Sequence, residues 1–282
     1  MKGSSPVFGK EESQIAGPGD CRPVSRVPAF YPAPCLPGAA RRAKTGILDP
    51  WILGILKFII TNDDGYGEPG LEALVAAAGA LGEVVVAAPK EPHSFISHRV
   101  TVKEPLRVEQ PDQGRFIVHG SPADCTRVAL KNLAPDADWL LAGINPGANL
   151  GTDVYQSGTV AAAREAAILG VRAVAVSQYV APGRTLDWTA ARHHTARVLT
   201  ELFQNDLALG EFWNVNLPSP CDPAAEADWQ FCPRDRHAHK YRFVEKEGYY
   251  HYKGTIHDRP HSIGSDVAVC FGGKIAVTRM EI

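Results

Sequence analysis

The stretch between residues 58 and 89 constrains the fold more than any other part of the chain. Residues 58–60 form a short apolar run, typical of a buried strand, that stops at an Asn-Asp-Asp-Gly turn. The apolar spacing over 69–81 predicts a helix closed by Gly82, and the apolar run 83–89 predicts a second buried strand. A strand, a helix and a strand in succession predict a βαβ unit with a right-handed crossover.

The same alternation continues as far as residue 218. Further strands are predicted at 139–145, 173–177 and 212–218, and further helices at 120–133, 160–169 and 187–205. Evenly spaced apolar residues over 100–108 and the run 116–118 predict additional strands, as in a hairpin. Ser121 is predicted as an N-cap, with Pro122 at the first helical position. The predicted fold class is therefore α/β, with a doubly wound, mostly parallel sheet.

Two segments flank this predicted core at 56–218. Residues 1–55 are rich in Pro, Gly, Ser and Arg, which predicts a disordered extension, and Leu56 is a candidate alternative start of the native protein. Residues 219–282 form a smaller β-rich portion, in which the loose alternation over 241–255 predicts a hairpin arm. Such an arm either packs on another subunit or lies as an edge flap on its own chain.

The composition excludes several classes of protein. A formal charge of −2 over 282 residues argues against a general binder of nucleic-acid duplexes or anionic membranes. The six cysteines form no C-x-x-C pair, and we expect reduced thiols. No secretory signal pattern follows Met1, and the apolar stretch 47–60 is too short and too charged to span a membrane. We expect a cytoplasmic protein.

Polar side chains follow three of the predicted strands. Asp63 and Asp64 follow the first strand, Ser94 the second and Asn145 the third. Doubly wound sheets bind ligands at the carboxyl ends of their strands, so these side chains are expected to converge. Their hard oxygen atoms suit Mg²⁺, Mn²⁺ or Ca²⁺ better than zinc. An isolated Asp-Asp-Gly is usually only a turn, but four oxygen donors at successive strand ends favour one divalent-metal site.

A glycine-rich loop leads into the helix predicted at 160–169. Ser157, Gly158 and Thr159 lie at its start, where free backbone N–H groups and the helix dipole suit a phosphate. The alternative is a plain Ser or Thr N-cap. Asn149 and His98 are further candidates for substrate contact, and His98 is either an acid, a base or a ligand-orienting group, or a structural histidine. A metal and an anion cradle together indicate phosphoryl chemistry.

Other catalytic patterns are missing. The sequence contains no G-x-x-x-x-G-K-[ST] and no G-x-S-x-G, which removes the P-loop and α/β-hydrolase readings. Scattered histidines between 237 and 261 are interpreted as surface residues rather than as a metal tract.

On these residues the chain resembles the SurE family of metal-dependent nucleoside monophosphate phosphatases, in order, over residues 57–218. The matching blocks are Thr61-Asn62-Asp63-Asp64-Gly65 with Pro69-Gly70, Ala88-Pro89 with Ser94 and His98, Gly120-Ser121-Pro122-Ala123-Asp124-Cys125, Gly143-Ile144-Asn145, Gly147-Ala148-Asn149-Leu150-Gly151-Thr152-Asp153-Val154 with Ser157-Gly158-Thr159-Val160, and Asn214-Val215-Asn216-Leu217-Pro218.

The resemblance implies that Asp63, Asp64, Ser94 and Asn145 hold the metal. It also implies a Rossmann-like core, a C-terminal portion that helps to form homodimers or homotetramers, and release of phosphate from 5'- or 3'-nucleotides. The chain departs from the family pattern at three positions, where it has Phe95 next to Ser94, Ala142 before Gly-Ile-Asn, and Glu68. These differences leave the predicted metal site intact but affect the expected substrate preference.

The predicted function is therefore a divalent-metal-dependent phosphatase, a 5'-nucleotidase, in which Asp63 and Asp64 are catalytic and Ser157, Gly158, Thr159, Asn149 and His98 contact the substrate. The alternatives are a non-catalytic protein that binds metal and nucleotide, and a phosphatase for another phosphoester such as short polyphosphate.

Overall fold

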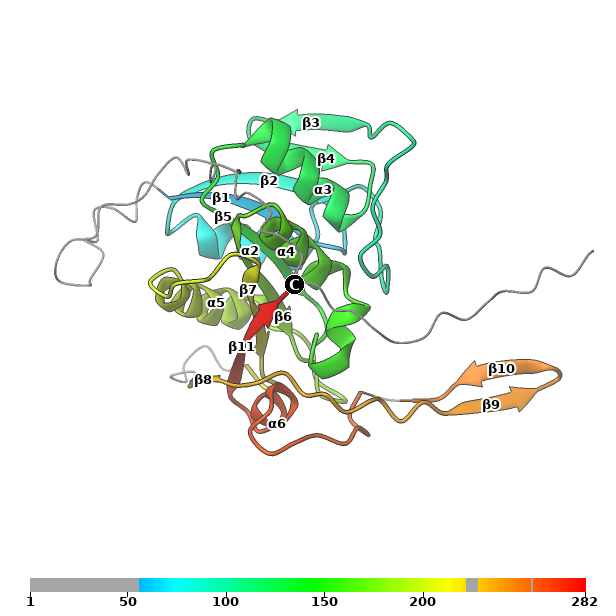
Figure 1. Ribbon diagram of the computed structural model, residues 1–282. Coiled ribbons are helices and arrows are strands. Elements are labelled where there is room, and N and C mark those ends of the chain that lie inside the picture. The colour runs from blue at the N-terminus through cyan, green and yellow to red at the C-terminus, as the bar shows by residue number, and fades with distance from the viewer. Residues whose placement is uncertain (1–55, 222–227, 255) are drawn as a thin grey trace, which may run out of the picture. The chain divides into compact units, whose positions relative to one another are not determined.

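One large sheet dominates the structure, a computed structural model that describes residues 56–221, 228–254 and 256–282 (Figure 1). In these residues nine strands pair in the order β3-β4-β2-β1-β5-β6-β7-β11-β8. Their bounds are β1 Lys57–Thr61, β2 Glu83–Pro89, β3 Val108–Asp112, β4 Arg115–Val118, β5 Trp139–Asn145, β6 Arg172–Gln178, β7 Glu211–Leu217, β8 Trp229–Phe231 and β11 Ile275–Glu281. The prediction for residues 1–55 falls outside the described residues.

The winding of the chain reverses between β1 and β5. From β1 the chain crosses to β2 on one side, and after β3 and β4 it returns to β5 on the other side of β1. The central strands are parallel, whereas β3 pairs antiparallel with β4 and β11 pairs antiparallel with β7. The predicted doubly wound, mostly parallel sheet is confirmed, and its switch point lies between β1 and β5.

Helices cover both faces of this sheet. The helices are α2 (Pro69–Ala78), α3 (Pro122–Val128), α4 (Gly158–Ile168), α5 (Trp188–Leu202) and α6 (Asp266–Phe271), with a π-helical turn at Ala129–Leu133 and a 3-10 turn at Gly151–Tyr155. The helices α2 and α5 cover one face, and α3 and α4 cover the other. No helix in the described ranges is long and apolar enough to cross a membrane.

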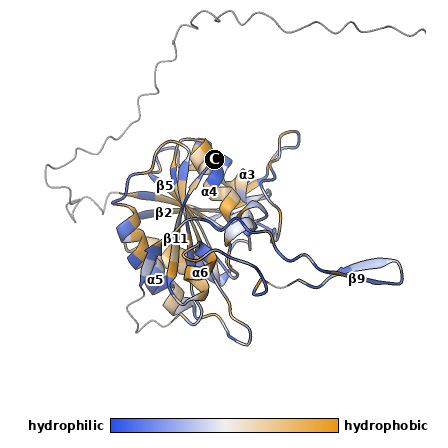
Figure 2. Ribbon diagram, turned by 60° about the horizontal axis from the view of Figure 1, so that its bottom comes forward, coloured by the Kyte–Doolittle hydropathy of each residue, from blue (hydrophilic) through white to orange (hydrophobic). Residues whose placement is uncertain are grey.

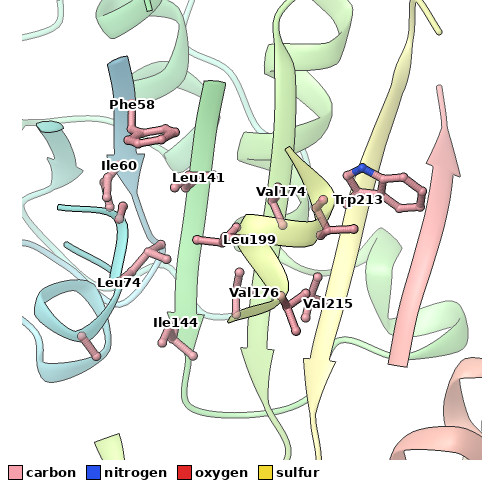
Figure 3. Close-up of a cluster of buried hydrophobic side chains, with 14 of the residues drawn as sticks. Phe58, Ile60, Leu74, Leu141, Ile144, Val174, Val176, Leu199, Trp213 and Val215 are labelled. Carbon is pink, nitrogen blue, oxygen red and sulfur yellow. The ribbon is translucent and has the colours of Figure 1, made fainter. Parts of the chain in front are cut away.

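Alternating side chains of β1 supply both cores. Phe58 and Ile60 point to the α2 and α5 side, where they join Leu74 and Leu199 in the cluster of Figure 3. Ile59, between them, is buried against the α3 and α4 side. A strand buried on both faces must be apolar at every position, which explains the uninterrupted hydrophobic run. Figure 2 shows hydrophobic residues gathered at the centre of the sheet, whereas the edge strand β3 has the mainly polar sequence Val-Glu-Gln-Pro-Asp.

The helix starts follow the predicted capping chemistry. Ser121 accepts a hydrogen bond from the Asp124 backbone N–H, and the Asp124 carboxylate accepts one from the Ser121 N–H, which completes a capping box. The helix α2 ends at Ala78, earlier than predicted. Gly82 serves another purpose, since a Cβ there would lie 2.2 Å from the Leu56 carbonyl oxygen.

The strand predicted around Val100 and Val102 is corrected by the structure. Val100 and Val102 do not belong to a strand, because the segment around them is fixed to the start of α3. There the Thr101 N–H and hydroxyl each donate to the Asp124 carboxylate, both at 2.8 Å. The predicted hairpin does form, from β3, which begins at Val108, and β4, which contains the apolar run 116–118. In addition, the elements α6 and β11 were not predicted individually.

The alternating segment near the C-terminus forms the predicted hairpin. The strands β9 (Phe243–Lys246) and β10 (Tyr249–Tyr252) pair antiparallel and form a sheet of their own. Every residue of both strands is exposed, and the hairpin extends away from the central sheet (Figure 1).

Candidate active site

The turn after β1 carries two adjacent carboxylates at the switch point of the sheet. Asn62 holds this turn together, because its side-chain amide donates to the Gly65 carbonyl at 2.9 Å and its side-chain oxygen accepts from the Gly65 N–H at 3.3 Å. Gly65 has φ 125°, a conformation that favours glycine. Asp63 and Asp64 are thus fixed at the carboxyl end of the central strand.

The start of α4 packs directly against Asp63. The Thr159 hydroxyl donates to Asp63 Oδ1, and a Cβ on Gly158 would lie 3.0 Å from Asp63 Oδ2. Burial raises the pKa of Asp63, and hydrogen bonds from the Thr159 side chain and from the Thr159 and Gly158 backbones oppose that rise. Gly158 is therefore needed for the close approach of the helix to this carboxylate.

Asp64 is less buried than Asp63 but has no stabilising partner. In the described part of the chain, no hydrogen bond or ion pair involves its carboxylate. Burial, followed by the nearby negative charges of Asp63 and Glu68, raises the pKa of Asp64 to about 7. The site thus holds two carboxylates with no cation beside Asp64, an arrangement that a divalent ion would stabilise.

Ser94 lies in a loop that is attached to the same turn. The His93 N–H donates to the Asp63 carbonyl at 2.7 Å, so the residue next to Ser94 contacts the turn directly. Ser94 itself is exposed. Its hydroxyl stays available for a ligand at this edge of the sheet.

Asn145 is the last residue of β5. β5 pairs with β1 on the side opposite to β2, the strand that precedes Ser94. Its amide nitrogen donates to the Gly147 carbonyl at 2.6 Å, which orients the side chain and leaves Oδ1 free to act as a ligand. A Cβ on Gly70 would lie 2.0 Å from the Ile144 carbonyl oxygen, so the start of α2 also packs against this strand end.

The four predicted metal ligands thus follow β1, β2 and β5, three neighbouring strands of the sheet. No group of three or more His, Cys, Asp or Glu side chains that could hold a metal ion occurs in the described residues. The set Asp63, Asp64, Ser94 and Asn145 has two carboxylates and two neutral oxygen donors. This chemistry fits a hard divalent cation.

The predicted phosphate-binding residues occupy two different environments. Ser157 is the N-cap of α4 and accepts a hydrogen bond from the Val160 N–H at 3.0 Å, while Thr159 faces Asp63. Asn149 is buried and donates from its side chain to Ser177 Oγ at 2.8 Å. Its carbonyl oxygen also accepts from Asn214 and Asn216. Asn149 therefore fixes the loop before α4, and its substrate contact stays a prediction.

His98 is held by charged residues that the sequence analysis did not identify. Its Nε2 lies 2.7 Å from Glu165 Oε2, and Arg127 donates to the other oxygen of Glu165 at 2.6 Å. Burial opposes ionisation of Glu165, but hydrogen bonds from His98 and Arg127 outweigh it and lower the pKa. Arg164 Nη1 lies 3.5 Å from His98 Nδ1. Glu165 and Arg164 are adjacent on α4, and their helical position gave no signal of this role.

A second group of carboxylates joins the loop at 150–156 to the C-terminal segment. We call Asp153, Asp235 and Asp266 the C-terminal carboxylate cluster. Arg259, whose side chain is fully buried, donates to Asp153 Oδ2 at 2.6 Å, and His239 bonds to Oδ1. These partners are 106 and 86 residues away from Asp153 along the chain, which explains why no local pattern indicated them.

Backbone N–H groups satisfy the rest of this cluster. Asp266 accepts from the Gly151 and Asp235 N–H groups, both at 2.8 Å. Asp235 accepts from the Ser262 N–H at 2.7 Å and from the His237 N–H at 2.8 Å. Burial alone would raise the pKa of Asp235, but these hydrogen bonds lower it to about 2. The cluster therefore anchors the loop that precedes Ser157.

Comparison with known proteins identifies relatives of this chain. The family model described as "Survival protein SurE" matches residues 58–240. A protein of Synechocystis sp. is 44% identical over 227 residues, which cover 80% of this chain and all of the relative. A protein of Myxococcus xanthus named "5'-nucleotidase SurE" is 35% identical over 233 residues, which cover 80% of this chain and 87% of the relative.

A solved structure supports the same relationship. The crystal structure of the SurE protein from Aquifex aeolicus superposes with a TM-score of 0.70 at 28% identity, covering 80% of this chain and 93% of that chain. The family match includes the turn after β1, the loop with Ser94, the end of β5 and the start of α4. The chain belongs to the SurE family.

Proposed function

We propose that this protein is a divalent-metal-dependent 5'-nucleotidase that hydrolyses nucleoside 5'-monophosphates, and also 3'-monophosphates, to nucleoside and phosphate. The observation that carries the proposal is the pair of carboxylates at the switch point. Asp63 is buried and accepts a hydrogen bond from Thr159, whereas Asp64 has no hydrogen-bond or ion-pair partner in the described residues. Relatives named 5'-nucleotidase SurE support the nucleotide as substrate.

In this proposal Asp63, Asp64, Ser94 and Asn145 hold one ion of Mg²⁺, Mn²⁺ or Ca²⁺. When bound, such an ion polarises a phosphoryl group and activates water. Thr159 keeps Asp63 Oδ1 in place through its hydroxyl, and the Asn145 amide is oriented by Gly147. These fixed contacts reduce the rearrangement needed when substrate arrives.

The substrate phosphate is assigned to the rim of this site. Ser157, Gly158 and Thr159 lie at the positive end of the α4 dipole, which favours an anion next to the carboxylate pair once a cation is present. His98, oriented by Glu165, is placed to hold or transfer a proton, and Asn149 is retained as a candidate contact.

Three alternatives have distinct outcomes. The first is direct attack by an aspartate instead of water, which would give a phospho-enzyme that can be trapped. The second is a binding protein without catalysis, and the third is a phosphatase for another phosphoester such as short polyphosphate.

The test is phosphate release from AMP, 3'-AMP, glycerol 2-phosphate and tripolyphosphate, before and after EDTA and after return of Mn²⁺ or Mg²⁺. We expect release from the nucleotides that EDTA abolishes and metal restores. Activity unaffected by EDTA would contradict the metal, and no release from any nucleotide would contradict the function.

Assembly and location complete the proposal. The exposed aromatic side chains of the β9–β10 hairpin support its use as a contact in a homodimer or homotetramer. The buried free thiols of Cys125, Cys232 and Cys270 support a reducing compartment, the cytoplasm. Sedimentation of the full chain, compared with a variant in which Tyr249 and Tyr250 are replaced by Ser, tests the assembly.

A further inference from the structure

Phe95 combines two unfavourable features. Its side chain is 83% exposed, although it is a large apolar ring. Its φ is 56°, in the left-handed region that residues with a bulky side chain avoid. Neither feature contributes to packing of the described residues. Strained backbone of this kind clusters at active sites, ligand clamps and switch regions.

The loop that carries Phe95 is fixed on both sides to the candidate active site. Before it, the His93 N–H donates to the Asp63 carbonyl at 2.7 Å. After it, Ser97 donates from its N–H to the Gln156 carbonyl at 3.0 Å and from its hydroxyl to the Tyr155 carbonyl at 2.7 Å. Phe95 is therefore held between the carboxylate turn and the residues that lead into α4.

The neighbours of Phe95 explain why its ring stays exposed. Ile96, the next residue, packs against the start of α4. A Cβ added to Gly158 there would lie 3.0 Å from Ile96 Cγ2. Ser94 precedes Phe95 and is itself exposed. Of these three side chains, the aliphatic one is packed inward and the aromatic one is left in solvent. An aromatic ring fixed at the rim of a site is suited to stack on a planar ligand.

We propose that Phe95 stacks on the nucleobase of the substrate and makes nucleotides preferred over other phosphomonoesters. This inference rests on the proposed nucleotidase function and adds the residue that recognises the base. Stacking uses the π-face that every base has, so it tolerates different bases. We therefore expect a broad preference that is stronger for purines, whose rings cover more of the phenyl face.

The experiment compares AMP with glycerol 2-phosphate, a phosphomonoester without an aromatic group, in the metal-loaded full chain. The measured quantity is the ratio of kcat/KM for AMP to kcat/KM for glycerol 2-phosphate. In Phe95→Ala the ratio should fall roughly 5- to 150-fold, the range that corresponds to the loss of one stacked base. Phe95→Trp should keep or increase the ratio.

A second substitution separates the ring from the backbone. Phe95→Gly removes the ring and also the steric cost of the positive φ, whereas Phe95→Ala removes only the ring. Both should lower the ratio equally, and Phe95→Gly should have the higher Tm of the two. Leu209→Ala, at another exposed apolar side chain, is the matched control and should leave the ratio unchanged.

Equilibrium binding gives an independent readout. Titration calorimetry with adenosine should show weaker binding to Phe95→Ala by the same factor. An unchanged ratio in Phe95→Ala, or a ratio that differs between the Ala and Gly variants, would overturn the stacking role while leaving the nucleotidase intact. If the wild-type chain releases no phosphate from AMP at all, the proposed function fails instead.

Discussion

Two groups of carboxylates in this molecule differ in how their charge is neutralised. In the C-terminal carboxylate cluster, Asp153 is paired with Arg259, and the other members accept backbone hydrogen bonds. In the turn after β1, Asp64 has no such partner in the described residues, and its pKa is raised to about 7. The contacts of the first group lie within the described chain, and the second group is the one for which we propose a bound cation.

The two groups of acids differ in their hydrogen-bond and ion-pair partners, and they do not differ in burial. Asp63 and Asp266 are both buried, and burial raises the pKa of both. Asp266, however, bridges Gly151 and Asp235, so it joins two parts of the chain. Asp64 makes no such contact in the part of the chain that the structure describes. A carboxylate with a raised pKa and no structural contact, placed at a switch point, is a candidate ligand-binding group.

The largest expected effect comes from Asp64. Asp64→Asn should lower kcat/KM for AMP by about 1,000-fold, because several kcal/mol of charge stabilisation depend on the bound ion. The Tm of the metal-free protein should stay the same or increase, since a repelled carboxylate is removed. Glu68→Gln is the matched control. The charge of Glu68 contributes to the raised pKa of Asp64, but Glu68 is exposed and is not one of the four proposed metal ligands.

Phosphate release and thermal unfolding measure these two quantities. An Asp64→Asn protein that keeps full activity would remove Asp64 from the site. A protein that unfolds would instead place Asp64 among the structural acids.

The second effect concerns the C-terminal carboxylate cluster. Arg259→Met should lower the free energy of unfolding by about 3 kcal/mol, because it leaves Asp153 without its buried cation. Chemical denaturation measures this change. The matched control is Arg279→Met, since Arg279 is half-exposed and its Nη1 lies 3.6 Å from Glu211 Oε2. This substitution should lower the free energy of unfolding by less than about 1 kcal/mol. Equal losses in the two variants would contradict the distinction.

The third effect tests how Asp63 is positioned. Thr159→Val removes the hydroxyl that donates to Asp63 Oδ1 while keeping a similar volume. The affinity for Mn²⁺ should fall about 10- to 100-fold, as for other groups that orient metal ligands. Thr159→Ser should retain the wild-type affinity. Titration of free Mn²⁺ by electron paramagnetic resonance measures the affinity, and equal binding by the Val and Ser variants would exclude this role.

The two groups should also show opposite pH dependences of stability. The folded pKa of Asp64, about 7, lies above its ordinary value of 3.8, so the folded state retains a proton that the unfolded chain loses. In the metal-free protein this lowers the free energy of unfolding as pH rises from 4 to about 7. The folded pKa of Asp235, about 2, lies below 3.8, so its contribution is lost as pH falls from 4 to about 2.

Urea unfolding across these ranges distinguishes the two groups. Asp64→Asn should flatten the upper range, and Asp235→Asn should flatten the lower one. If both variants changed the free energy of unfolding in the same pH range, the two groups would not differ in how their charge is neutralised.

The parts predicted from sequence are those that local patterns determine. Asp63 and Asp64 follow a run that is apolar on both faces, so the strand and its end are visible in adjacent residues. The capping box of Ser121 and the hairpin turn near Gly248 are also local. The family resemblance added the order of the blocks, and the comparisons confirm the family.

The parts that were missed depend on contacts distant in sequence. The place of β11 between β7 and β8 follows from pairing with strands distant in sequence, and the role of Arg259 from its contact with Asp153. Val100 and Val102 have strand-like spacing, but hydrogen bonds from Thr101 to Asp124 fix that segment elsewhere. Sequence spacing cannot anticipate a side chain that competes for the backbone in this way.

The position of β11 has a consequence for synthesis on the ribosome. Because β11 lies between β7 and β8, β7 has no partner on that side until residues 275–281 have been made. At about 5–20 residues per second, the roughly 60 intervening residues take about 3–12 s to add. During this time β7, with Phe212 and Trp213, is an open apolar edge on the nascent chain. Slower translation after residue 217 would lengthen that exposure and favour aggregation before the sheet is complete.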